Sequence, residues 1–205
     1  MPFFNLEYWI YKNEKKNNVH FDPKKERVQI LTGPNGSGKT SYEKGTIGAI
    51  LEGNSIGYVS AEYATMPMFD GIAYLDRVTE RQDKKLSAYA QEIEYFKELL
   101  PLIKSKKTLF VSIDEGFSTT SARYQEALSF GVLCEFLQSP HFLQFATHNH
   151  EFVNFFQDSK ISLAKPYHFK FSIADNKIEW HYELREGHEL SYGVEVAKTM
   201  GLSFD

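Results

Sequence analysis

Cysteine is almost absent from this chain, which has one among its 205 residues. A single cysteine excludes a disulfide framework within the chain and a cysteine-rich zinc site. The apolar neighbours of Cys134 predict a buried position in a helix. No run approaches the roughly 20 apolar residues that a membrane span needs, and the first residues lack the pattern of a signal peptide. We therefore expect a cytoplasmic protein that does not enter a membrane.

An excess of positive charge is also lacking, since 23 basic residues face 27 acidic ones and the net charge is −4. This balance excludes a protein that binds nucleic acid over its whole surface. The basic residues gather only locally, at Lys12, Lys15, Lys16, Lys24, Lys25 and Arg27, and at Lys104, Lys106 and Lys107. These clusters leave open only a weak, sequence-independent contact with DNA phosphates.

Aromatic residues are plentiful, with 17 phenylalanines and 12 tyrosines, which excludes disorder as the main state. Apolar runs predict strands at 27–31, 55–60, 108–113 and 142–147, and helices at 39–51, 87–100 and 121–138. This alternation predicts an α/β fold with a mainly parallel sheet flanked by helices. Alternating runs at 1–21 and 167–184 predict antiparallel β hairpins. We expect residues 61–85 to be irregular and a short helix to span 192–200.

The strongest motif is GPNGSGKT, residues 33–40, which fits the phosphate-binding pattern G-x-x-x-x-G-K-[ST] between a strand and a helix. Its glycines let backbone N–H groups wrap around a phosphate. Lys39 would reach the β- and γ-phosphates, and the Thr40 hydroxyl would bind Mg²⁺. The expected ligands are therefore ATP and Mg²⁺. The expected nucleotide-binding residues are Gly33, Pro34, Asn35, Gly36, Ser37, Gly38, Lys39, Thr40 and Ser41.

Two further strand ends carry polar side chains that suit the same chemistry. Asp114 and Glu115 follow the most strand-like run, so Asp114 is a candidate metal ligand and Glu115 a candidate base for the attacking water. His148 follows the next strand and is a candidate contact for the γ-phosphate. The alternatives are a solvated acidic pair and a polar surface histidine. A metal site at His148 and His150 is disfavoured, because side chains two positions apart on a strand diverge.

Ser87 opens a predicted helix in the segment LSAYAQEI. A serine at this position can cap the helix, with no ligand involved. In ABC-type ATPases a Leu-Ser sequence at a helix start points at the γ-phosphate held by a partner subunit. The glycines usual in that signature are missing here, so both interpretations stay open.

Together these motifs resemble the ATPase domain of the MutS mismatch-repair family. The likeness spans residues 17–202 and includes SAEYATMPMFDGI, IDEGFSTTS, FATHNHEF and LSYGVEVAKTMGL. It implies an ABC-type P-loop ATPase with an antiparallel β subdomain. It also implies one domain over 1–205, in which 1–26 form a β region and 27–205 the P-loop core and C-terminal hairpin and helix. The sequence offers no match to the family's adenine-stacking aromatic residue.

The resemblance further implies an ATP-dependent, head-to-tail homodimer that hydrolyses Mg-ATP to control its opening and closing in DNA mismatch repair or related DNA maintenance. Glu115 and His148 would be catalytic, Thr40 and Asp114 would hold the metal, and Ser87 would act in the partner's site. The length leaves no room for the family's DNA-binding, lever and clamp domains. We therefore expect an isolated ATPase domain, or a heteromeric partner that supplies the DNA contacts.

Two other functions fit the P-loop. A P-loop small-molecule kinase usually adds an arginine-rich lid, and the arginines of this chain are few and unclustered. A nucleotide-gated interaction module with little turnover fits the departures from the family's signature, since KKLSAY lacks its Gly-Arg-Ser-Thr-Phe pattern. A transporter ATPase is disfavoured, because its signature is the fuller Leu-Ser-Gly-Gly-Gln.

Overall fold

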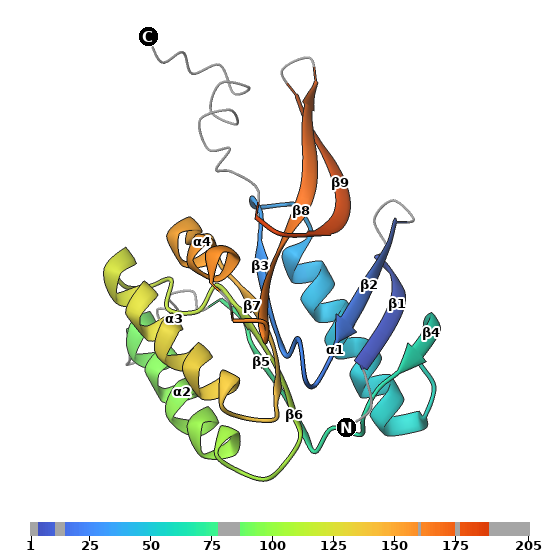
Figure 1. Cartoon of the computed structure of the whole chain (residues 1–205), viewed down its shortest axis with the longest axis horizontal. Coiled ribbons are helices and arrows are strands. Elements are labelled where there is room, and N and C mark those ends of the chain that lie inside the picture. The colour runs from blue at the N-terminus through green and yellow to red at the C-terminus, as the bar shows by residue number, and fades with distance from the viewer. Residues whose placement is uncertain (1–3, 11–14, 78–86, 160, 175–176, 189–205) are drawn as a thin grey trace.

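The structure is a computed structural model that describes residues 4–10, 15–77, 87–159, 161–174 and 177–188, and the side chains from residue 17 onward (Figure 1). The helices within these ranges are α1 (Lys39–Ile56), α2 (Ala88–Ile103), α3 (Ala122–Leu137) and α4 (His150–Asp158). The strands are β1 (Phe4–Ile10), β2 (Lys15–Phe21), β3 (Val28–Thr32), β4 (Ala61–Thr65), β5 (Gly71–Leu75), β6 (Leu109–Asp114), β7 (Phe142–Ala146), β8 (Ala164–Ala174) and β9 (Lys177–Glu186).

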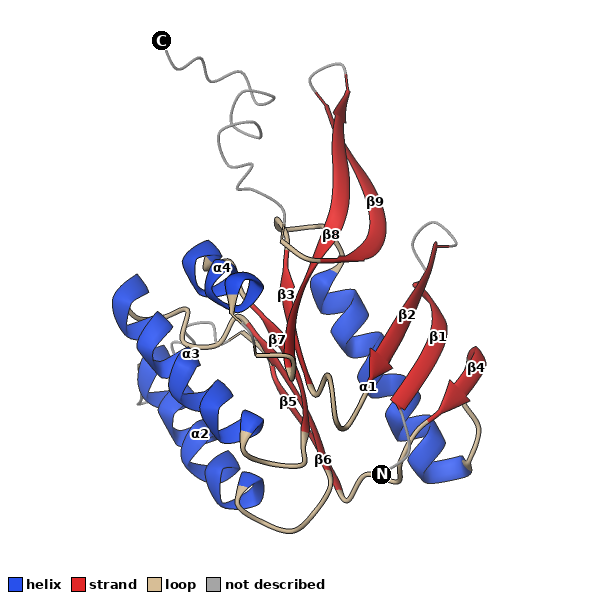
Figure 2. Cartoon of the chain, viewed as in Figure 1, coloured by secondary structure: helices blue, strands red, loops and turns tan. Residues whose placement is uncertain are grey.

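Two sheets organise these elements. The larger has the order β5-β6-β7-β3-β8-β9 and is parallel except for β9, which pairs antiparallel with β8. The smaller, β2-β1-β4, is antiparallel. Helices α2, α3 and α4 lie on one face of the larger sheet, while α1 and the smaller sheet lie on the other (Figure 2). This confirms the α/β fold and both hairpins.

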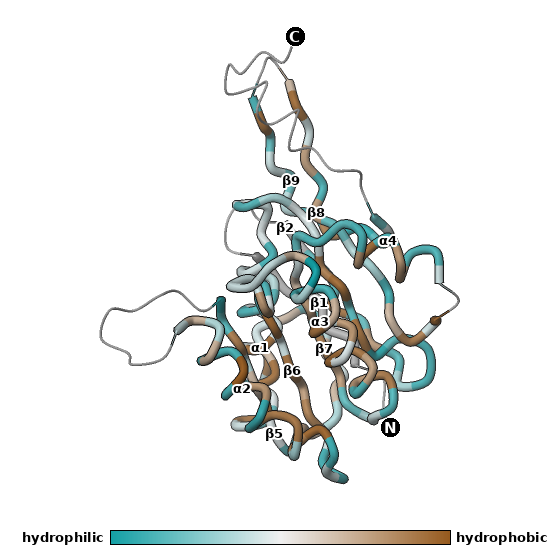
Figure 3. The backbone as a smooth tube through the Cα atoms, turned by 90° about the vertical axis from the view of Figure 1, so that its left-hand side faces the viewer, coloured by the Kyte–Doolittle hydropathy of each residue, from teal (hydrophilic) through white to brown (hydrophobic). Residues whose placement is uncertain are grey.

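The three central strands β3, β6 and β7 are buried along their whole length, and the tube through β6 is mostly brown, which marks apolar residues (Figure 3). Successive side chains of a strand point to opposite faces. Val111 and Leu143 thus join the core beneath α2, α3 and α4, while Phe110 and Phe142 join the core beneath α1. A sheet covered on both faces leaves only its edges and strand ends for a site.

The carboxyl ends of β3, β6 and β7 meet at one edge of this sheet. The Glu115 N–H donates to the Ala146 carbonyl at 3.1 Å, and the Thr147 N–H donates to the Leu31 carbonyl at 2.9 Å. The loops that follow these strands are therefore neighbours, although other helices and strands separate them in the chain. The candidate residues of all three motifs lie in these loops, at the end of β6 or at the start of α1.

The prediction of a strand at 55–60 is wrong. Helix α1 continues to Ile56 and ends at Gly57, whose φ of 68° suits a left-handed C-cap. The expectation that 61–85 are irregular is also wrong in part, because β4 and β5 lie there. Both are edge strands with partly exposed side chains, so hydrogen bonds to a neighbouring strand decide their structure more than any local apolar pattern does.

Three smaller expectations also need correction. Helix α2 contains Pro101 and runs past the expected end at Leu100 to Ile103. Cys134 is exposed, since the buried face of α3 is formed by other positions, among them Val132 and Leu133. Helix α4 had not been expected. The helix expected at 192–200 lies outside the described residues.

His141 precedes β7 at the edge of the sheet opposite the candidate motifs, and it contacts the end of α2 and the start of β6. His141 is fully buried, its Nε2 lies 2.7 Å from the Ile103 carbonyl, and its Nδ1 accepts from the Leu109 N–H at 3.3 Å. An Nδ1 that accepts carries no proton, so the ring is neutral. Burial lowers the pKa of His141, and the backbone bond to Ile103 opposes this shift.

We expect the free energy of unfolding to fall as the pH drops below about 6.5. The folded pKa of His141 is depressed, so the unfolded chain binds more protons in this range, with a limiting slope of about 1.4 kcal/mol per pH unit. Urea denaturation at several pH values checks this, with His141→Gln as the comparison. The variant should lose about 1–3 kcal/mol at pH 7.5 and show a shallower pH slope. The same pH slope in the unmodified protein and in His141→Gln would show that His141 does not cause the pH dependence.

Candidate functional site

The loop after β3 has the backbone shape of a phosphate cradle. Gly33 and Gly38 have φ values of 146° and 113°, which L side chains rarely adopt. A Cβ at Gly33 would lie 2.8 Å from the Ser37 Oγ, and one at Gly38 would lie 3.3 Å from the Tyr182 ring. Helix α1 begins at Lys39, directly after the loop, so its free N–H groups face the space that the loop encloses.

Lys39 is only 5% exposed. Its Nζ donates to the Gly33 carbonyl at 2.7 Å and lies 3.4 Å from the Pro34 carbonyl. Burial lowers the pKa of Lys39, and the nearby carboxylates of Glu115 and Asp114 oppose the shift. The ammonium group is thus held inside the loop, where an anionic ligand would gain most from it.

The Thr40 hydroxyl donates to the Asp114 carboxylate over 2.7 Å. Adjacent oxygens around Mg²⁺, with bonds of about 2.0–2.1 Å in an octahedron, lie about 2.9 Å apart. The hydroxyl and carboxylate oxygens therefore suit two neighbouring positions around that ion. No group of three or more His, Cys, Asp or Glu side chains in the described part of the chain could hold a metal. A cation here would need phosphate or water oxygens to complete its shell.

Glu115 is 7% exposed, and each of its carboxylate oxygens contacts a basic side chain. One lies 2.6 Å from the His148 Nε2 and the other 3.0 Å from an Arg77 nitrogen. The same His148 nitrogen lies 3.1 Å from the Asn35 side-chain oxygen, so it carries the proton and donates. The hydrogen bond from His148 lowers the pKa of Glu115; burial raises it, and Arg77 and Lys39 lower it further. Glu115 is therefore an ionised carboxylate at neutral pH.

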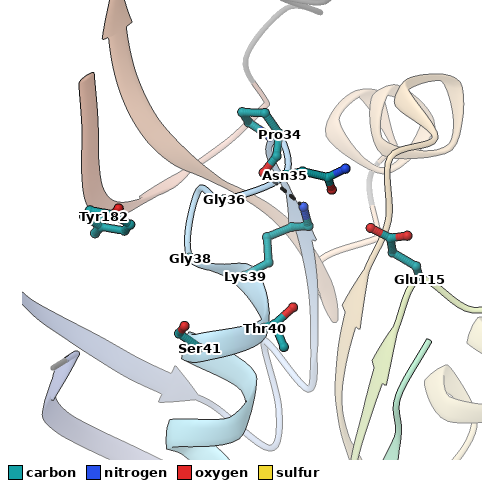
Figure 4. A pocket seen from close by; sticks show the side chains of 9 residues that line it. All are labelled: Pro34, Asn35, Gly36, Gly38, Lys39, Thr40, Ser41, Glu115 and Tyr182. Atoms are coloured by element: carbon teal, nitrogen blue, oxygen red, sulfur yellow. Dashed lines mark hydrogen bonds between the residues drawn. The ribbon is translucent and has the colours of Figure 1, made fainter. Parts of the chain in front are cut away.

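Lys39, Thr40 and Glu115 border a pocket of about 190 Å³ (Figure 4). Its lining residues are Pro34, Asn35, Gly36, Gly38, Lys39, Thr40, Ser41, Glu115 and Tyr182. Tyr182 lies on the opposite side of the loop from Glu115 (Figure 4). Its φ of 53° falls in an irregular stretch of β9, where the pairing with β8 shifts register. Such an irregularity redirects a side chain, here toward the glycine-rich loop.

The structure thus brings together the candidates from three motifs and leaves one apart. Ser87 is exposed and caps α2, since its hydroxyl accepts from the Ala90 N–H at 3.2 Å. It does not line the pocket. Ser37 is buried and also outside the lining, and its Oγ has no hydrogen-bond partner in the described structure. His148 reaches the site through Glu115 and Asn35.

Sequence reasoning missed three residues of this region. Arg77 follows β5, which had not been expected as a strand, and Tyr182 depends on the irregularity in β9. Glu43 is fully buried on α1, and its carboxylate accepts from the Ser112 hydroxyl at 2.8 Å. Burial raises the pKa of Glu43 well above its usual range, and Asp114 adds to the shift. For Glu43, the sequence signal of a buried role was a charged residue on the inward face of α1.

Known protein families and relatives of this chain indicate the same kind of site. The model of the family MutS domain V matches residues 29–204. The chain belongs to the MutS domain V family. Domain V is the ATPase domain of MutS proteins, so the resemblance and the assignment as an ATPase are confirmed.

Several full-length relatives are similar to this chain. The DNA mismatch repair protein MutS of Natronomonas pharaonis is 29% identical over 183 residues, which cover 88% of this chain and 21% of the relative. The DNA mismatch repair protein MSH3 of Candida glabrata is 29% identical over 197 residues, 91% of this chain and 18% of the relative. MutS of Thermotoga neapolitana is 28% identical, over 91% and 24%. The chain thus spans about a fifth of the length of these relatives. No helix in the described ranges is both long and apolar enough to cross a membrane.

Two glycines of the same region provide a matched test of the loop geometry. Gly38→Ala should lower the free energy of unfolding by about 1–3 kcal/mol and weaken ATP binding, because the new methyl group meets Tyr182 at an unfavourable φ. Gly48→Ala, inside α1 with open space around it, should raise stability by about 0.5–1 kcal/mol. Urea denaturation and ATP titration of both variants check this. Equal effects of the two changes would contradict the strained geometry of the loop.

Proposed function

We propose that this chain is a MutS-type ATPase domain that hydrolyses Mg-ATP to control the opening and closing of a dimer in mismatch repair or related DNA maintenance. The observation that carries the proposal is the convergence of Lys39, Thr40, Asp114, Glu115 and His148 at one edge of the sheet. The names of the relatives support the link to mismatch repair. Residues 1–205 would act as one domain, since Asn17 of β2 bonds to the backbone of β9 at Tyr182 and Leu184.

ATP would bind with its phosphates against the glycine-rich loop and the amino end of α1. Lys39 would exchange its carbonyl partners for the β- and γ-phosphate oxygens, which offer full negative charge. Thr40 and Asp114 would hold Mg²⁺, which when bound neutralises charge on the phosphates. Tyr182 offers an aromatic ring at the far side of the loop, where a nucleotide base can stack.

Glu115 would accept a proton from the water that attacks the γ-phosphate. Both of its oxygens contact cationic or donor groups, His148 and Arg77, which makes the carboxylate a weak base as it stands. A γ-phosphate is a stronger partner for both groups, and its arrival would free one oxygen of Glu115 for the water. His148 would thereby sense the γ-phosphate and make base activation depend on it.

Ser87 would serve the site of a partner subunit. It is exposed at the start of α2 and lies outside the pocket of its own chain, which suits a contact made in trans. The exposed lysines Lys24, Lys25, Lys104, Lys106 and Lys107 precede β3 and β6, at the sheet edge opposite the pocket. Any DNA contact through them would be weak and far from the nucleotide. Other segments of the protein or a heteromeric partner would then recognise mismatches.

Removal of the lysine ammonium group tests the phosphate site directly. Lys39→Ala should weaken Mg-ATP binding about 10- to 100-fold, because charge-assisted hydrogen bonds to the phosphates are lost. Lys44→Ala is the control, since Lys44 lies on the same helix but pairs with Asp76. Isothermal titration calorimetry of both folded variants measures the effect. Unchanged affinity in Lys39→Ala would overturn the site.

Glu115→Gln tests both the base and the dimer. The amide keeps the shape but loses basicity, so single-turnover hydrolysis should fall about 10²- to 10⁴-fold while ATP still binds. Unhydrolysed ATP would then hold two subunits together, giving a dimer with Mg-ATP and mostly monomer with ADP. Adding Ser87→Arg should abolish that dimer. Sedimentation measures the masses, and a mass that ignores the nucleotide would contradict the dimer. Negligible hydrolysis by the unmodified protein would favour an interaction module.

A further inference from the structure

Helix α2 buries a carboxylate within an otherwise mostly apolar face. Ala88, Phe96, Leu99 and Ile103 of this helix pack into the protein, and Glu92 lies on the same face with 4% of its surface exposed. A carboxylate in such a place is unfavourable unless hydrogen bonds compensate for lost water. Glu92 belongs to neither the phosphate loop nor the strand ends, so its burial needs another explanation.

The compensating groups all come from the loop that follows β6. The Thr119 hydroxyl donates to the Glu92 carboxylate in a short hydrogen bond. Burial raises the pKa of Glu92, whereas this bond and backbone bonds from Phe117, Thr119 and Ser118 act in the opposite direction. The hydrogen bond from Thr119 thus ties the Glu92 carboxylate of α2 to this loop.

A second contact joins the same two elements. The Phe96 ring stacks on the Phe117 ring, with centroids 4.3 Å apart and planes at 20°. Phe117 is 1% exposed and its φ is 59°. Phe96 lies one helical turn after Glu92, so the side chains stand on one face of α2 and reach the loop together.

The loop needs these anchors because its backbone is strained. Glu115 and Phe117 both have positive φ values, 55° and 59°, although neither is glycine. Such conformations persist only where the surrounding structure enforces them. In this conformation the Glu115 carboxylate reaches the pocket and the His148 nitrogen. Release of Phe117–Thr119 would let the backbone relax and move Glu115 away.

We propose that Glu92 is a positioning residue that holds the loop 115–119 on α2 and so keeps the Glu115 carboxylate in its catalytic place. This inference rests on the proposed hydrolytic role of Glu115. Glu92 does not touch the pocket and would act only through the loop. Because Ser87 caps the start of α2, the helix that would meet the partner's nucleotide also holds the base of its own site.

Three variants test the proposal by hydrolysis. Glu92→Gln places an amide N–H₂ among N–H donors, and Thr119→Val removes the hydroxyl at an exposed position without loss of shape. Both should lower kcat about 10- to 100-fold, the effect of a small misplacement of a catalytic group, while ATP affinity stays within twofold. Thr119→Ser restores the donor and should restore kcat. Glu94→Gln is the control, because Glu94 is an exposed carboxylate of the same helix paired with Lys97.

Amide hydrogen exchange of the nucleotide-free protein separates this proposal from the proposed function. Exchange at 117–119 should accelerate at least tenfold in Glu92→Gln and Thr119→Val, and stay unchanged in Thr119→Ser and Glu94→Gln. Unchanged exchange and kcat in Thr119→Val and in folded Glu92→Gln would overturn the positioning role. Faster exchange with a normal kcat would overturn it too, because the loop would then not control Glu115. If the unmodified protein does not hydrolyse ATP, the proposed function fails, and with it the catalytic half of this proposal, whereas the exchange data still decide whether Glu92 holds the loop.

Discussion

The site depends on one constraint, which is that buried charges must find partners. Lys39, Asp114 and Glu115 are each less than 10% exposed where β3 and β6 end. A single buried charge is costly to desolvate, and opposite charges offset that cost only when hydrogen bonds complete their coordination. Here loop carbonyls receive the ammonium group, the Thr40 hydroxyl meets Asp114, and His148 and Arg77 meet Glu115. Each of these buried charges thus has a partner within the protein, and an anionic ligand would take over some of these contacts.

The network lies between two kinds of backbone, the regular strands of the larger sheet and the irregular loops that follow them. The strands β3, β6 and β7 are buried throughout and bring three distant loops together. The loops then adopt backbone conformations with positive φ, which glycine permits at Gly33 and Gly38 but which are unfavourable at Glu115 and Phe117. In the loop after β6, the hydrogen bond from Thr119 to Glu92 and the stacking of Phe117 on Phe96 offset this strain.

The sequence predicted those parts of the candidate site whose residues directly follow a strand in the chain. The phosphate loop, the acidic pair after β6 and the histidine after β7 are each contiguous with the strand that positions them, and parallel pairing brings the three strand ends together. The predictions that failed were those where local apolar pattern is a poor guide. The end of α1 and the edge strands β4 and β5 lack buried alternation, so chain neighbours do not reveal what tertiary pairing decides.

The α/β alternation, the phosphate-binding loop and the family could be recognised from the order of the amino acids alone, because each is carried by short contiguous motifs. Three contacts became visible only in the folded chain. Arg77 pairs with Glu115, and Tyr182 faces the glycine-rich loop. Glu92 holds the loop after β6. These contacts join segments that are 27 or more residues apart, as the bond from Thr119 to Glu92 shows. Their geometry follows from how the sheet, the β9 irregularity and helix α2 pack in space, which no local pattern of residue types records.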